Sequence, residues 1–207
     1  VSKHQAESMP GLLLGDAFPN FEADTTIGKL KLYDFLGDSW GILFSHPRDY
    51  TPVCTTELGQ AAELSPEFTK RNVKMIALSI DSLEEHYSWS KDILAYNNDE
   101  TVSEIPFPII ADDRRELAVE LGMLDPEEKD QSGMPLTARC VTPKLILNIC
   151  HHSETQDNLF LFFKKPGDCV MVPPAIPEDE ARSLFPAGVY TKELPSGKRY
   201  LRYIPQP

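Results

Sequence analysis

The stretch H-P-R-D-Y-T-P-V-C-T-T-E, residues 46–57, decides which fold this chain is expected to adopt. It follows an apolar run at 41–45, which has the composition of a buried strand, and it continues into a helical pattern. The sulfur of Cys54 should therefore lie near the free N–H groups and the positive end of a helix dipole, which favour a thiolate. The sequence thus predicts a nucleophilic cysteine at the junction of a strand and a helix.

Two neighbours of Cys54 strengthen this interpretation. Thr51 lies three residues earlier and can form a hydrogen bond with the sulfur or with a bound oxygen. Pro52 can shape the turn and shield the sulfur from water.

Around this stretch, strand and helix patterns alternate. A capping box, Ser82 to Glu85, marks one helix start, with Leu83, Tyr87 and Leu94 continuing that helix, and Ser65-Pro66 predicts a restart or kink in an earlier helix. Alternation of this kind predicts an α/β fold with a parallel arrangement and right-handed crossovers. The expected strands are 29–33, 41–45, 74–80, 107–111 and 137–141, and the expected helices are 58–68, 83–94 and 114–121.

From residue 167 onward, frequent prolines indicate a second, small module. We expect a short helix at 178–184, followed by a hairpin with strands at 189–194 and 198–204 around a Pro195-Ser196-Gly197 turn.

Composition narrows the functional classes. The 207 residues carry a net charge of −12, which argues against nucleic acid as a partner. No apolar run approaches the length of a transmembrane helix, and residues 1–8 lack the apolar core of a secretory signal. We treat 1–8 as an extension, expected to be disordered, before Met9. Four cysteines do not form a disulfide framework, so we expect a reducing, cytoplasmic setting.

Three stretches resemble a known family. Residues 47–54 match P-x-x-x-T-x-x-C, the signature of the peroxiredoxins. The stretches G-M-L-D-P-E-E-K-D (122–130) and T-K-E-L-P-S-G-K-R-Y-L-R-Y (191–203) are similar to the one-cysteine branch of that family. The likeness covers about 9–141 and 167–207. It implies a thioredoxin-like fold at 9–165, with a central mixed sheet flanked by helices, and a small C-terminal α+β module at 166–207.

The resemblance implies a thiol peroxidase. Cys54 would attack hydrogen peroxide or an organic or phospholipid hydroperoxide and become a sulfenic acid. Thr51 would bind the peroxide, Pro52 would cover the site, and Arg139 would stabilise the thiolate and the developing charge. His46 resembles a family histidine beside the pocket, with a packed core histidine as the alternative.

No second cysteine stands in a resolving motif of the family. The resemblance therefore implies reduction by an external thiol such as glutathione, with a glutathione transferase as a possible delivery partner; resolution by Cys169 is the alternative. No metal or organic cofactor is expected, because Cys140 with Cys150-His151-His152 matches no standard ligand spacing. The family also suggests a homodimer, peripheral contact with phospholipid, and lysosomal or related acidic organelles besides the cytoplasm.

Ser39 lies in G-D-S-W-G (37–41), which fits the G-x-S-x-G pattern of serine hydrolases. A strand rather than a helix follows it, so spacing alone predicts a turn. One-cysteine relatives have a phospholipase A2 activity that uses this serine, but Tyr33 occupies their histidine position. We therefore expect weak or absent phospholipase activity.

The family pattern is lost at 141–165, where this chain is shorter and the long family helix is missing. Residues 144–149 could replace a strand, and the apolar run at 158–163 could cover the exposed sheet face. This block motivates an alternative function: a non-catalytic, partly folded form that binds full-length partners or acts like a chaperone.

Overall fold

The computed structural model describes residues 17–97, 104–142 and 169–205, with the backbone alone at Cys140, Val141, Thr142 and Val170. Several predictions fall outside the described residues and stay predictions. They concern the extension at 1–8, the module boundary at 165–166, the strand at 144–149, the apolar run at 158–163, and Cys150, His151 and His152.

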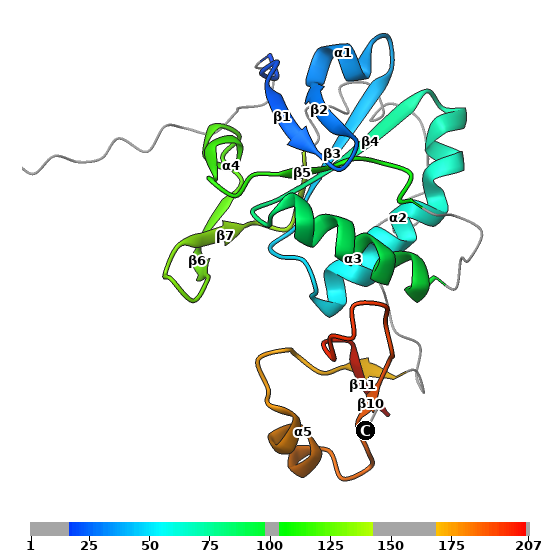
Figure 1. Ribbon diagram of the computed structural model, residues 1–207, viewed down its shortest axis with the longest axis vertical. Helices are drawn as coiled ribbons and strands as arrows, with labels where there is room; N and C mark the ends of the chain where they lie inside the picture. Colours follow the sequence, from blue (N-terminus) through cyan, green and yellow to red (C-terminus); the bar gives the residue numbers. More distant parts are fainter. Residues whose placement is uncertain (1–16, 98–103, 143–168, 206–207) are drawn as a thin grey trace, which may run out of the picture.

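The main body is built on a mixed six-stranded sheet with the order β2-β1-β5-β4-β3-β8 (Figure 1). The strands β3, β4 and β5 run parallel, while β1, β2 and β8 are antiparallel to their neighbours. Parallel neighbours need helical crossovers, and α2 and α3 provide them. The strands are β1 (Glu22–Thr25), β2 (Gly28–Lys31), β3 (Trp40–Ser45), β4 (Val73–Ser79), β5 (Ile109–Ala111) and β8 (Cys140–Thr142).

Helices cover both faces of this sheet, because side chains on successive strand residues point to opposite faces. The helices α2 (Pro52–Lys70) and α3 (Leu83–Tyr96) pack on the face that carries Ile42 and Phe44, and their core residues include Cys54 and Trp89. The short helices α1 (Leu32–Leu36) and α4 (Glu116–Glu120) contribute to the core on the other face.

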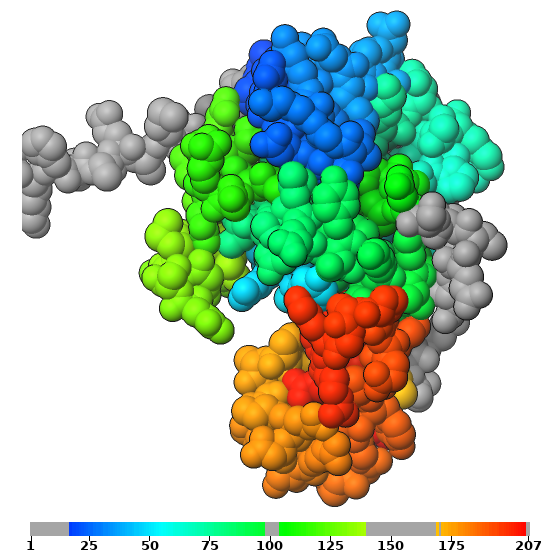
Figure 2. All heavy atoms as spheres, viewed as in Figure 1, coloured from blue at the N-terminus to red at the C-terminus, as the bar shows by residue number. Residues whose placement is uncertain are grey.

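A hairpin and a C-terminal module complete the described chain. The hairpin pairs β6 (Leu124–Lys129) with β7 (Pro135–Thr137). The module contains β9 (Val170–Met171), α5 (Glu178–Leu184), β10 (Tyr190–Thr191) and β11 (Arg202–Ile204), and has a small core of its own. Figure 2 shows the module as a separate lobe whose hairpin touches the main body.

Buried polar contacts tie the module to α3. The carboxylate of Asp92 accepts hydrogen bonds from the Ser196 N–H (2.7 Å) and hydroxyl (2.5 Å) and from the Tyr200 hydroxyl (3.1 Å). The Tyr200 hydroxyl also lies 3.2 Å from Oγ1 of Thr55, the residue after Cys54. Leu194, Tyr200 and Leu201 join the core around Cys54. The module is therefore anchored on α3 and also contacts α2, the helix that carries the cysteine.

The structure confirms the α/β class, the central mixed sheet, the capping box at Ser82 and the helix at 178–184. Four details were wrong. The strand expected at 29–33 ends at Lys31, because α1 begins at the next residue, and α2 runs through Pro66 without the restart expected there. Leu83, Tyr87 and Leu94 all belong to α3, as expected; Tyr87 lies on its exposed side, because His86, Trp89 and Ile93 form the buried face.

The other two corrections concern strand pairing. The strand expected at 137–141 is divided: Thr137 pairs with β6, and β8 begins only at Cys140. The C-terminal hairpin pairs over fewer residues than expected, because Leu194, Tyr200 and Leu201 pack into the main core. Strands β6 and β9 were not predicted. No helix among the described residues has the length and apolar character needed to span a bilayer.

Candidate active site

The end of β3 and the start of α2 place Cys54. Thr51 precedes the helix in an extended conformation, and Pro52 occupies its first position, where a missing N–H leaves no helical hydrogen bond unmade. Cys54 follows in the first turn with 1% of its surface exposed. Pro52 is buried as well, and the Thr51 hydroxyl donates to the carbonyl of Arg48 (3.0 Å).

Arg139 reaches this sulfur from a distant part of the chain. Its Nη2 lies 3.4 Å from Sγ of Cys54, and its Nη1 pairs with the carboxylate of Glu57 one turn further along α2. Two hydrogen bonds fix the backbone at Ala138, the residue before Arg139. The Ser45 hydroxyl donates to the carbonyl of Ala138 (2.6 Å), and the N–H of Ala138 donates to the carbonyl of Met123 (2.7 Å).

Burial and charge act on Cys54 in opposite directions. Burial raises the pKa of the Cys54 thiol above its ordinary value, although the charge of Arg139 and a hydrogen bond with Thr51 lower it. Burial likewise raises the pKa of Glu57 against the lowering effect of Arg139. The thiolate expected from the helix start is therefore not favoured outright in this pocket. Thiolate formation depends on how strongly Arg139 stabilises the Cys54 sulfur, because the same guanidinium also pairs with Glu57.

His46 lies in a buried polar chain rather than free in the pocket. Its Nε2 is 2.9 Å from Oδ1 of Asp49, and Oδ2 of Asp49 is 2.7 Å from Nδ1 of His86. His86 Nε2 lies 3.2 Å from the carbonyl of Ile110. Burial works to lower the pKa of His86, but the hydrogen bond and charge of Asp49 outweigh it and raise that pKa. Burial works to raise the pKa of Asp49, and the two histidines outweigh it and lower that pKa.

Three residues of this site were not singled out from the sequence. Glu57 could have been found, because it lies one helical turn after Cys54 and so on the same face of α2. Asp49 belongs to the stretch quoted first, yet nothing in its spacing marks it as a partner of two histidines. His86 gives no local signal, since only the tertiary packing of α3 brings it to Asp49.

Ser39 does not belong to a catalytic arrangement in the described part of the chain. Its hydroxyl donates to the side-chain oxygen of Asn72 (2.8 Å), and its N–H donates to the carbonyl of Leu36. The Tyr33 hydroxyl donates to the carbonyl of Phe18 (2.5 Å). No described histidine or carboxylate forms a hydrogen bond with Ser39. The residue therefore occupies a turn before β3.

Cys54 and Cys169 are free thiols, the first buried and the second exposed. Among the described residues, His46, Asp49 and Asp81 bring possible metal-ligating atoms within 4.8 Å of one another. These side chains already form hydrogen bonds with one another or with neighbouring residues. His46 Nε2 contacts Asp49 Oδ1, and Asp81 Oδ2 accepts from the N–H of Asp49 (2.8 Å) and from the Ser79 hydroxyl (2.8 Å). The cluster therefore serves as a hydrogen-bond network.

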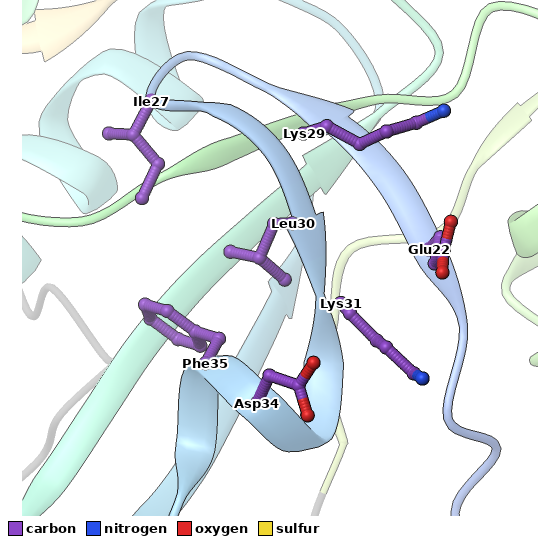
Figure 3. Close-up of a pocket in the computed structure, with 7 residues that line it drawn as sticks. All are labelled: Glu22, Ile27, Lys29, Leu30, Lys31, Asp34 and Phe35. Carbon is purple, nitrogen blue, oxygen red and sulfur yellow. The ribbon is translucent and has the colours of Figure 1, made fainter.

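A separate groove lies on the β1–β2 hairpin and α1 (Figure 3). Apolar Ile27, Leu30 and Phe35 line it together with charged side chains of both signs, namely Glu22, Lys29, Lys31 and Asp34. It shares no residue with the cysteine site.

Comparison with known proteins identifies the class. Residues 14–146 match the model of the AhpC/TSA family. The chain therefore belongs to that family and is a peroxiredoxin, an oxidoreductase that reduces peroxides with thiols.

Individual relatives agree with this assignment. The chain is 60% identical to peroxiredoxin-6 of Gallus gallus and to peroxiredoxin-6 of Homo sapiens, over 96% of this chain and 100% of each relative. A crystal structure of the C45S mutant of peroxiredoxin 6 of Arenicola marina superposes with a TM-score of 0.62 at 45% identity, covering 95% of this chain and 99% of that one. A yeast mitochondrial 1-Cys peroxiredoxin gives a TM-score of 0.55 at 35% identity, with 94% and 100% coverage.

The alignment with the chicken protein extends over 223 positions, more than the 207 residues of this chain. The relative therefore has residues inside the matched span that this chain lacks.

Replacing His86 with Gln should change how stability depends on pH. Because the pKa of His86 is raised on folding, its contribution is complete below its ordinary pKa of 6.5 and is lost as pH rises through the raised value. The wild-type protein should therefore lose its stability advantage over His86→Gln as pH increases, in denaturant unfolding between about pH 6 and pH 9. Tyr87→Gln, on the exposed side of α3, serves as the control. A difference in free energy of unfolding that does not vary with pH would contradict a charged His86.

Proposed function

We propose that Cys54 reduces hydrogen peroxide and organic or phospholipid hydroperoxides in a one-cysteine cycle with glutathione as the external thiol. The contact between Arg139 Nη2 and Cys54 Sγ carries this proposal, since a guanidinium beside a buried sulfur can stabilise both the thiolate and the negative charge of the transition state. Thr51 and Pro52 complete the pocket. The Thr51 hydroxyl donates to the carbonyl of Arg48 in this structure and would turn away from it to bind a peroxide oxygen.

In the proposed step, the Cys54 sulfur forms a bond with the terminal peroxide oxygen while the O–O bond breaks. The electron pair of that bond leaves with the other oxygen, which takes up a proton and departs as water or an alcohol. The sulfur is oxidised by two electrons to the sulfenic acid. One glutathione then forms a mixed disulfide and releases water, and a second glutathione restores the thiol and leaves as glutathione disulfide.

A comparison with a relative supports an external reductant. The similar yeast mitochondrial enzyme is described as a 1-Cys peroxiredoxin with thiol resolution through glutathione/thioredoxin systems. We extend the first of these reductants to this chain, with a glutathione transferase as the delivery partner.

We further propose that the protein is cytoplasmic, needs no metal or organic cofactor, forms a homodimer and makes peripheral contact with phospholipid. The alternative is a non-catalytic form that binds full-length peroxiredoxin. This chain lacks residues that the chicken relative has inside the matched span, and their loss, which can weaken the fold, motivates that alternative. A cooperative thermal unfolding transition would argue against it.

Peroxide consumption with glutathione should depend entirely on Cys54. The Cys54→Ser variant should lose the activity, because serine is not oxidised by peroxide, whereas Cys169→Ser should keep it. The measurement is the initial rate of hydrogen peroxide loss. Equal rates for the wild type and Cys54→Ser would refute the proposal.

Mass spectrometry of the same peroxide-treated samples separates the two cycles. We expect the sulfenic acid of Cys54 or its glutathione adduct. An internal disulfide between Cys54 and Cys169 would instead establish a two-cysteine cycle.

Phospholipid hydrolysis should be weak or absent, because the Ser39 hydroxyl is bound to an amide and no base activates it among the described residues. Release of fatty acid from phosphatidylcholine vesicles should be the same for the wild type and for Ser39→Ala. Robust hydrolysis that disappears in Ser39→Ala would overturn this expectation.

A further inference from the structure

Tyr50, the residue directly before Thr51, has a φ of 54°, in the left-handed region that bulky side chains rarely adopt. It lies in the turn between β3 and α2, across which the Thr51 hydroxyl reaches the carbonyl of Arg48 (3.0 Å). The left-handed conformation costs free energy in a residue with a Cβ, so it persists only where surrounding groups fix it. The groups that hold Tyr50 therefore help to decide where Thr51 lies.

Two side chains of the C-terminal module hold the ring of Tyr50. The ammonium of Lys198 lies 3.1 Å from the centre of the ring, and the ring of Tyr200 meets it edge-on at 79°, with 5.8 Å between centroids. Both contacts are attractive, because the face of an aromatic ring is negative and its edge is positive. The Tyr50 hydroxyl adds a long contact with the carbonyl of Glu85 in α3 (3.4 Å).

The module also fixes the other end of the segment that carries the cysteine. The Tyr200 hydroxyl lies 3.2 Å from Oγ1 of Thr55, and the Thr55 hydroxyl donates to the carbonyl of Thr51 (2.8 Å). The N–H of Thr55 donates to the same carbonyl (3.0 Å). Thr51 and Cys54 thus lie between two points that the module contacts, the ring of Tyr50 and the side chain of Thr55.

Lys198 differs from the residues that dock the module. Leu194, Tyr200 and Leu201 are buried in the main core, whereas Lys198 is exposed. Its cation reaches the Tyr50 ring, where it stabilises the active-site turn rather than the core of the module. Replacement of Lys198 should therefore leave the module docked.

We propose that Lys198 is a positioning residue of the peroxidase site: together with the ring of Tyr200, it holds Tyr50 in the left-handed conformation and so keeps Thr51 beside Cys54. This inference rests on the proposed function. The Thr51 side chain forms a hydrogen bond with Cys54, so a change at Tyr50 is passed directly to the sulfur. Small displacements there slow the reaction, because sulfur and peroxide have to meet in a defined geometry.

The second-order rate constant for oxidation of Cys54 by hydrogen peroxide tests the cation. Lys198→Met removes the charge and keeps most of the side-chain length, and it should lower the rate constant about two- to fivefold, the factor that corresponds to an exposed cation–π contact. Lys198→Arg should restore the wild-type value, because a guanidinium also stacks on aromatic rings.

Arg199→Met is the matched control, because the neighbouring residue loses the same charge but pairs with Glu178 inside the module. Its rate constant should match the wild type. An unchanged rate constant in Lys198→Met, an equal loss in Arg199→Met, or no recovery in Lys198→Arg would overturn the inference.

A double-mutant cycle tests whether Lys198 acts through Tyr50. Tyr50→Phe keeps the ring, so Lys198→Met should lower the rate constant by the same factor in this background as in the wild type. Tyr50→Gly has no ring, and there Lys198→Met should cause no further loss. A full loss in the Tyr50→Gly background would show that Lys198 acts by another route and would contradict the proposal.

Tyr50→Gly and Tyr50→Ala isolate the backbone conformation, since neither variant has a ring. Glycine adopts a positive φ without steric cost, whereas alanine does not. The rate constant of Tyr50→Gly should therefore exceed that of Tyr50→Ala by about fivefold or more, although glycine is the more flexible residue. Equal rate constants, or a faster Tyr50→Ala, would rule out a role for the left-handed turn.

The proposed function and the role of Lys198 fail in different ways. A wild-type Cys54 that reacts with hydrogen peroxide no faster than free cysteine would overturn both. Each contrary result with the Lys198 or Tyr50 variants would overturn the positioning role alone and leave the peroxidase proposal intact.

Discussion

The pairing of β8 with β3 is the interaction on which the active site depends. Ser45, the last residue of β3, pairs with Cys140, and its hydroxyl holds the carbonyl of Ala138. Arg139 lies between these two contacts, so the register of the strands determines where its guanidinium can reach. A shift of one residue would turn the side chain to the opposite face of the sheet, away from Cys54.

The position of Cys54 combines two opposing requirements of a protected nucleophile. Burial keeps water away from the sulfur but raises the cost of ionising it, and Arg139 has to offset that cost while it also binds Glu57. The C-terminal module helps to hold the helix that carries Cys54. Tyr200 joins Thr55 of the cysteine helix to Asp92 of α3, so docking of the module and the placement of Cys54 are coupled.

Local patterns predicted much of this structure. The capping box at Ser82, the alternation of strands and helices, and the proline before Cys54 act within a few residues of chain, so the sequence reveals them. The contact of Arg139 with Cys54 spans 85 residues, and only the family resemblance indicated it. His86 and Tyr200 could not be foreseen, because their partners are chosen by tertiary packing. The division of the expected strand at 137–141 has the same origin: Thr137 and Cys140 pair with different sheets.

The most direct test of this account is the second-order rate constant for oxidation of Cys54 by hydrogen peroxide in Arg139→Gln, with Arg182→Gln as a control for the loss of one exposed arginine. We predict that Arg139→Gln lowers the rate constant by about 100-fold, the effect of removing one donor that stabilises transition-state charge. Arg182→Gln should match the wild type. An unchanged rate constant in a folded Arg139→Gln protein would contradict the claim that β8 delivers the residue on which the chemistry of Cys54 depends.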